Sequence, residues 1–114
     1  MLEEKLQLKP GQTIAIVDGK VSIPLNAPRA TPNEAAAVLL FVAGKAALLN
    51  RMADLKEWAN AGKLTWVAYP KVGLLGTDIN RDSLRELVNA YGLDPVRQVA
   101  IDATWSALRL KPLA

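Results

Sequence analysis

One short segment in the second half of the chain gathers side chains that could bind a ligand. Residues 69–82 read YPKVGLLGTDINRD, with an aromatic residue, two basic residues, two aspartates and an asparagine. They follow an apolar run that predicts a strand and precede a pattern that predicts a helix. Ligands of open α/β sheets bind beyond the carboxyl ends of the parallel strands, where helix N-termini favour anions. One hypothesis is therefore a small anionic ligand bound by Lys45, Tyr69, Lys71 and Arg81.

The same segment has a purely structural interpretation, which we favour. Asp78, Asn80 and Asp82 lie where helix caps and first-turn acids are stabilising, so the helix terminus can be satisfied without a ligand. The aspartates would also repel an anion. Their spacing resembles the start of a calcium loop, but Ser83 replaces the required glycine and Asn89 the required glutamate. No metal site is predicted.

Several kinds of chemistry are excluded by composition, because the chain contains neither histidine nor cysteine. Thiol nucleophiles, imidazole acid–base catalysis and thiolate or imidazole zinc sites are all removed. Asp18, Asp78 and Asp102 could approach one sheet edge, but a lone aspartate after a strand is more often a turn former. No catalytic residue and no cofactor is predicted, and an enzyme is the less favoured class.

A second candidate surface lies near the carboxyl end of the sequence. Trp105, with Arg97 and Arg109 nearby, could form an exposed aromatic and basic patch for a protein partner. The alternative, which we favour, is a tryptophan folded over the sheet with two arginines lying alongside it. Edge strands and the apolar composition make a homodimer plausible.

The charge balance argues against nucleic acid as a partner. Fourteen basic and eleven acidic residues give a net charge of +3, and the basic residues are scattered singly. Nucleic-acid binding needs several phosphates neutralised from one face. No apolar run approaches the roughly 20 residues of a membrane-spanning helix, and the acidic start does not resemble a secretory signal. We expect a soluble cytoplasmic protein.

The order of predicted elements defines the fold class. Apolar runs predict strands at residues 13–17, 37–43 and 64–70, with a shorter extended piece at 21–25. Helical spacing predicts a helix over residues 45–59. It also predicts a second amphipathic helix, from about Arg81, with Leu84, Leu87, Val88 and Tyr91 on one face and Gly92 after it. Residues 95–110 predict an antiparallel hairpin whose loop includes Asp102 and extends toward Trp105.

One element has two interpretations. TPNE, residues 31–34, forms a capping box that could begin a helix, whereas the following AVLLFVA is apolar throughout, as in a strand covered on both faces. We favour the strand because a clearer helix follows. The chain, residues 1–114, is then one α/β domain: a small Rossmann-like mixed sheet of five or six strands, with a parallel centre, a C-terminal antiparallel hairpin and two main helices.

Two parts of the sequence resemble known families. AGKLTWVAYPK, residues 61–71, is similar to the late strand of class I methyltransferase-like domains, which also end in an antiparallel hairpin. More closely, WVAYPK, TDINRDSL and PVRQVAIDATWSALRL resemble a family of small bacterial proteins known as a domain of unknown function. The resemblance covers about Ala37 to Leu110. It implies a reduced Rossmann-like sheet and no assigned activity.

The sequence departs from the methyltransferase pattern after the first strand. Such enzymes carry an acidic, glycine-rich turn there, which leads into a helix. This chain has VDGKVSIPL, with Gly19 alone. We therefore expect a non-catalytic domain acting through protein interaction or self-association. The alternative is a small anionic-ligand binder, or a degenerate methyltransferase-like enzyme, that uses the strand edge at residues 69–82.

Overall fold

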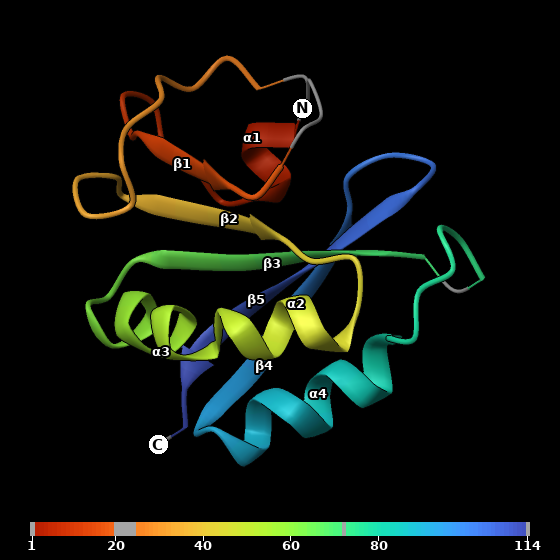
Figure 1. The fold of residues 1–114 in the computed structure, drawn as a ribbon. Coiled ribbons are helices and arrows are strands. Elements are labelled where there is room, and N and C mark those ends of the chain that lie inside the picture. Colours follow the sequence, from red (N-terminus) through yellow and green to blue (C-terminus); the bar gives the residue numbers. More distant parts are fainter. Residues whose placement is uncertain (1, 20–24, 72, 114) are drawn as a thin grey trace.

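The computed structural model describes residues 2–19, 25–71 and 73–113. Its elements follow the order α1 (Leu2–Lys5), β1 (Ile14–Val17), β2 (Ala37–Phe41), α2 (Lys45–Asn50), α3 (Met52–Asn60), β3 (Leu64–Pro70), α4 (Arg81–Ala90), β4 (Leu93–Ala100) and β5 (Trp105–Pro112). Helices α2, α3 and α4 lie on one face of the sheet, and α1 lies on the other (Figure 1).

A single five-stranded sheet confirms the predicted fold class. Its strand order is β1-β2-β3-β5-β4. β1, β2 and β3 are parallel, and β5 runs antiparallel to both β3 and β4. The carboxyl ends of β1, β2, β3 and β4 therefore lie at the same edge as the amino end of β5. Within the described residues, no helix has the length and apolarity needed to cross a bilayer.

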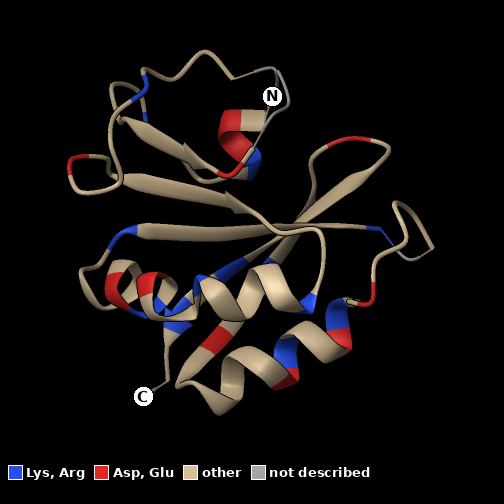
Figure 2. Cartoon of the chain, in the orientation of Figure 1, with Lys and Arg blue, Asp and Glu red and all other residues tan. Residues whose placement is uncertain are grey.

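The core has two layers because alternate strand residues face opposite sides of the sheet. Val38, Leu40 and Val67 pack under the three larger helices, whereas Leu39 and Trp66 pack under the amino-terminal segment. β2 is buried at every residue, which confirms the strand over residues 37–41. The three parallel strands carry no charged residue, and charges lie on helices, loops and the hairpin (Figure 2).

The TPNE segment closes one turn and does not begin a helix. The Thr31 hydroxyl donates to the Glu34 carboxylate, and the N–H groups of Glu34 and Ala35 both donate to the Thr31 carbonyl. The chain then enters β2, which pairs with strands on both sides. Sheet pairing thus outweighs a local helix signal. The predicted extended piece at 21–25 lies almost entirely outside the described residues.

The predicted helix over residues 45–59 is interrupted at Arg51, which has φ −108° and ψ 4°. Gly62 follows the end of α3 with φ +81°, the left-handed conformation that commonly ends a helix. The helix predicted from about Arg81 is confirmed as α4. Its predicted face was wrong at one position, because Tyr91 follows the last helical residue and is 43% exposed.

The hairpin loop comprises residues 101–104, because Trp105 is already the first residue of β5. Asp102 shapes this loop as predicted. Its carboxylate accepts hydrogen bonds from the backbone N–H groups of Thr104 and Trp105, each at 2.8 Å. Such a contact from an aspartate side chain to the backbone two residues later favours a turn.

Candidate functional site

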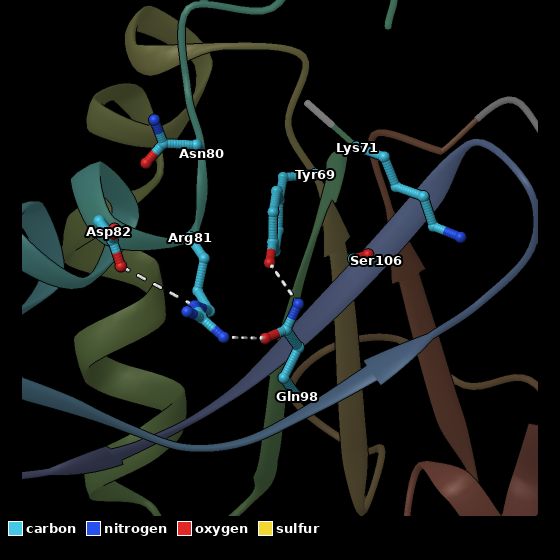
Figure 3. A pocket seen from close by; sticks show the side chains of 7 residues that line it. All are labelled: Tyr69, Lys71, Asn80, Arg81, Asp82, Gln98 and Ser106. Atoms are coloured by element: carbon cyan, nitrogen blue, oxygen red, sulfur yellow. Dashed lines mark hydrogen bonds and ion pairs between the residues drawn. The ribbon is translucent and has the colours of Figure 1, made fainter. Parts of the chain in front are cut away.

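The site lies where the carboxyl end of β3 meets the start of α4. Tyr69 and Ser106 are direct cross-strand partners on β3 and β5, so their side chains lie next to each other on the helix-bearing face. They are 3% and 7% exposed, respectively. Both line a pocket of about 420 Å³, with Lys71, Asn80, Arg81, Asp82 and Gln98 around them. We call this the hydroxyl pocket (Figure 3).

A short chain of hydrogen bonds fixes the Tyr69 hydroxyl. The Gln98 amide nitrogen donates to the Tyr69 oxygen at 3.2 Å, and the Gln98 amide oxygen accepts from the Arg81 guanidinium at 3.4 Å. Since the Tyr69 oxygen acts as the acceptor, its own hydrogen remains available to donate. Burial raises the pKa of the Tyr69 phenol, and the nearby positive charge of Arg81 opposes that rise. The phenol is therefore protonated at neutral pH.

Ser106 is 7% exposed, and its side chain lines the pocket. Buried polar groups are normally satisfied by protein or solvent. A serine hydroxyl can both donate and accept. Two hydroxyl-bearing side chains from neighbouring strands, each able to donate one hydrogen bond, thus line the same pocket.

The two predicted cations at the pocket are placed on opposite sides. Arg81 reaches toward Gln98 from α4, while the Lys71 amine extends away from Tyr69 on the far side (Figure 3). Arg81 is loosely held, since its contact with Asp82 is 3.8 Å and its side chain is 62% exposed. An exposed pair of this kind contributes little, so the guanidinium can turn toward a ligand.

Lys45 does not line the pocket; its backbone participates in a different contact. The Lys45 N–H donates to the Asp78 carboxylate at 2.8 Å. Asp78 therefore caps α2 from the distant loop after β3. Its carboxylate occupies the space that a side chain at Gly44 would need, because a Cβ there would lie 2.6 Å from the Asp78 Oδ1. The cap of α4 is Asn80, which forms a reciprocal capping box with Ser83.

Replacing Asp78 by alanine is expected to lower the free energy of unfolding by about 1 kcal/mol, the usual effect of losing a helix cap. The physical reason is that α2 has no other side-chain cap. Urea unfolding followed by circular dichroism measures this. Glu57→Ala, which removes an exposed carboxylate from α3, is the matched control and should leave the midpoint nearly unchanged. Equal urea midpoints for Asp78→Ala and Glu57→Ala would show that Asp78 does not stabilise α2 as a cap.

Asp18 also has a structural contact. Its carboxylate accepts two hydrogen bonds from Arg51, at 2.9 and 3.0 Å, and Arg51 also contacts Asp54 at 3.1 Å. These hydrogen bonds hold the pKa of Asp18 below its usual range. Asp18 has φ +58°, a left-handed conformation that aspartate tolerates better than most residues. The three aspartates of the sheet edge thus have separate partners, and no pair of them shares a contact.

The second predicted surface is brought together on the opposite face of the hairpin. Arg97 and Arg109 are direct cross-strand partners, and Trp105 lies on the same face of β5 as Arg109. Trp105 is half-buried and packs edge-on against Phe41, with ring centroids 5.0 Å apart. Arg109 donates to the Gln7 side chain. The tryptophan therefore packs over the sheet, and Arg97 is the exposed member of the set.

Comparison with protein-family models and with curated proteins gave no match.

Sequence patterns did not indicate Ser106 or Gln98 as site residues. Their place in the pocket depends on the register of the hairpin against β3, which the sequence does not specify. The one available signal was that Ser106 is a polar residue within the apolar run WSALRL. Within the described residues, no three carboxylates come close enough together to hold a metal ion.

Proposed function

We propose that this protein binds a small oxyanion, such as a phosphate or carboxylate group, in the hydroxyl pocket. The observation that carries this proposal is that Tyr69 and Ser106, two largely buried cross-strand partners with hydroxyl groups, line one pocket. Hydroxyl donors in a partly dry site form strong hydrogen bonds with anionic oxygens. A binding function also fits a chain without histidine or cysteine.

Charge around the pocket supports an anion more than a cation or a neutral ligand. Arg81 contributes a positive charge next to Gln98 and Tyr69, Lys71 contributes a second one on the far side with its amine turned away from Tyr69, and Asp82 contributes one negative charge. The N-terminus of α4 contributes little, since Asn80 and Ser83 already satisfy part of it. The proposal therefore depends on the hydroxyls and the cations, and not on the helix terminus.

A degenerate methyltransferase-like enzyme at the same edge is the alternative, based on the sequence resemblance to class I methyltransferase-like domains. Two observations weigh against it. The described residues between β1 and β2 contain no helix, so half of a nucleotide-binding crevice is reduced. The pocket lining also lacks an evident general base, because Asp82 is exposed and Tyr69 is a protonated phenol. The proposed role is binding in the cytoplasm, without catalysis.

The test is titration with sodium phosphate and sodium sulfate, followed by amide chemical shifts. We expect saturable shifts that are centred on Tyr69, Gln98 and Ser106. Arg81→Gln should weaken the binding several-fold, whereas Arg29→Gln, which removes a distant exposed charge near β1, should leave it unchanged. Shifts that are absent, or that scatter over the surface without saturation, would overturn the proposal.

A second candidate function is protein interaction or self-association. The loop after β3 exposes Leu74 and Leu75, at 39% and 64%, and Leu75 has φ +55°. Exposed apolar side chains on an irregular loop are typical of contact surfaces. Association through the open edge of β4 is disfavoured, because Pro95 and a bulge at Val96 interrupt that strand. Such interruptions are common in edge strands that are protected from association. Sedimentation at several concentrations, with Leu75→Asp as the variant, distinguishes a loop-mediated dimer from a monomer.

A further inference from the structure

A second hollow adjoins the hydroxyl pocket, on the same side of the sheet. It also has a volume of about 420 Å³ and lies between α4 and the hairpin. Arg81, Asp82 and Gln98 line both hollows. The two hollows therefore adjoin along α4, with the contact between Arg81 and Gln98 shared by both, and together we call them the groove.

The shape of the second half is set by an irregularity in β4. The pairing of β4 with β5 shifts between Pro95 and Arg97, which leaves Val96 as an extra residue. A bulge bends the strand locally and often lies next to a binding site. Pro95 and Val96 both line the hollow, and Val96 is 47% exposed.

The second half adds one basic side chain on the helix-bearing face. Arg85 lines it together with Arg81. Arg81 and Arg85 are four residues apart in α4, which places them on one face about 6 Å apart along the helix axis. Neither Lys71 nor Arg85 forms an ion pair within the part of the chain that the structure describes.

We infer that the groove accepts a ligand with at least two linked phosphate groups, one on the Tyr69 and Ser106 hydroxyls and another against Arg85. This inference rests on the proposed anion-binding function. A single phosphate occupies only the first half, whereas a linked pair can also reach the guanidinium one helical turn away. Arginine suits this role because its planar group binds phosphate oxygens in pairs.

Two sources could supply this chemistry, a nucleoside polyphosphate or an inorganic polyphosphate chain. The second hollow has no aromatic side chain on which a base could stack. Recognition of the phosphate chain alone is the simpler expectation. Adenosine triphosphate and inorganic tripolyphosphate should then bind with similar affinity. Tighter binding of the nucleotide would still support two linked phosphates and would assign a contact to the nucleoside.

The experiment is calorimetric titration of the full chain with phosphate, pyrophosphate and tripolyphosphate at fixed ionic strength. We expect at least a tenfold gain in affinity from phosphate to tripolyphosphate. Arg85→Ala should remove most of this gain and change phosphate affinity less than twofold. Arg29→Ala, which removes the same charge at the other edge of the sheet, should preserve the gain.

Two results would overturn the inference. One is equal affinity for phosphate and tripolyphosphate, which leaves the single-anion proposal intact. The other is an equal loss from Arg85→Ala and Arg29→Ala, which indicates attraction by net charge alone. Failure of the proposed function looks different, because phosphate itself then gives no saturable binding. Circular dichroism of each variant verifies that it is folded.

Discussion

Replacing Trp66 by alanine is expected to destabilise the domain by about 3–5 kcal/mol, the usual range for deleting a large aromatic side chain from a core. Trp66 is 0% exposed in the layer beneath α1. Its indole N–H donates to the Leu6 carbonyl at 3.1 Å, so the variant also leaves a buried acceptor unpaired. Thermal unfolding should show a midpoint lower by at least about 10 °C.

This effect would identify what holds the amino-terminal segment on the sheet. α1 has four residues, too few for a stable helix in isolation. Trp66→Phe keeps most of the apolar volume but removes the N–H, and should therefore give an intermediate loss. Leu49→Ala is the control, because Leu49 is 44% exposed on α2. If Trp66→Ala and Leu49→Ala shift the midpoint equally, Trp66 is not a central packing residue.

Tyr69→Phe and Ser106→Ala are each expected to weaken phosphate binding roughly 10-fold to 100-fold. Each substitution removes one hydroxyl donor to an anionic oxygen, a contact of about 1.5–3 kcal/mol, and 1.4 kcal/mol corresponds to a factor of ten. Neither changes the shape of the strand. Calorimetric titration measures the affinity, and urea unfolding verifies that stability changes by much less than in Trp66→Ala.

A matched control exists for the tyrosine. Tyr91 follows the carboxyl end of α4, is 43% exposed and lies outside the hydroxyl pocket. Tyr91→Phe should therefore leave phosphate affinity unchanged. If Tyr69→Phe and Tyr91→Phe bind phosphate as tightly as the unmodified protein, the hydroxyl of Tyr69 does not contact the anion.

The fold could be predicted from sequence where local chemistry and long-range pairing agree. β2 and β3 are continuous apolar runs bounded by turn residues, and α4 has both a cap at Asn80 and a stop near Gly92. Two features of the structure were not predicted from the sequence. The four-residue α1 has no amphipathic pattern, and its position depends on contacts with Trp66. The break at Arg51 coincides with the hydrogen bonds of Arg51 to Asp18, on a distant strand end.

Only part of the candidate site could be predicted, because the rest depends on long-range pairing. Tyr69, Lys71 and Arg81 follow from topology, because the carboxyl end of a parallel strand and the start of the next helix lie together. Ser106 and Gln98 depend on register in the hairpin, and a shift by one residue would turn both away from the helices. Asp78 was assigned to the wrong helix, since its contact with Lys45 joins residues 33 positions apart.

A crystal structure grown or soaked in phosphate tests the central proposal most directly. We predict an anion in the hydroxyl pocket, within hydrogen-bond distance of both the Tyr69 and Ser106 oxygens, with Arg81 turned toward it and away from Gln98. Anions found elsewhere on the surface, with the hydroxyl pocket holding water alone at saturating phosphate, would contradict the proposal.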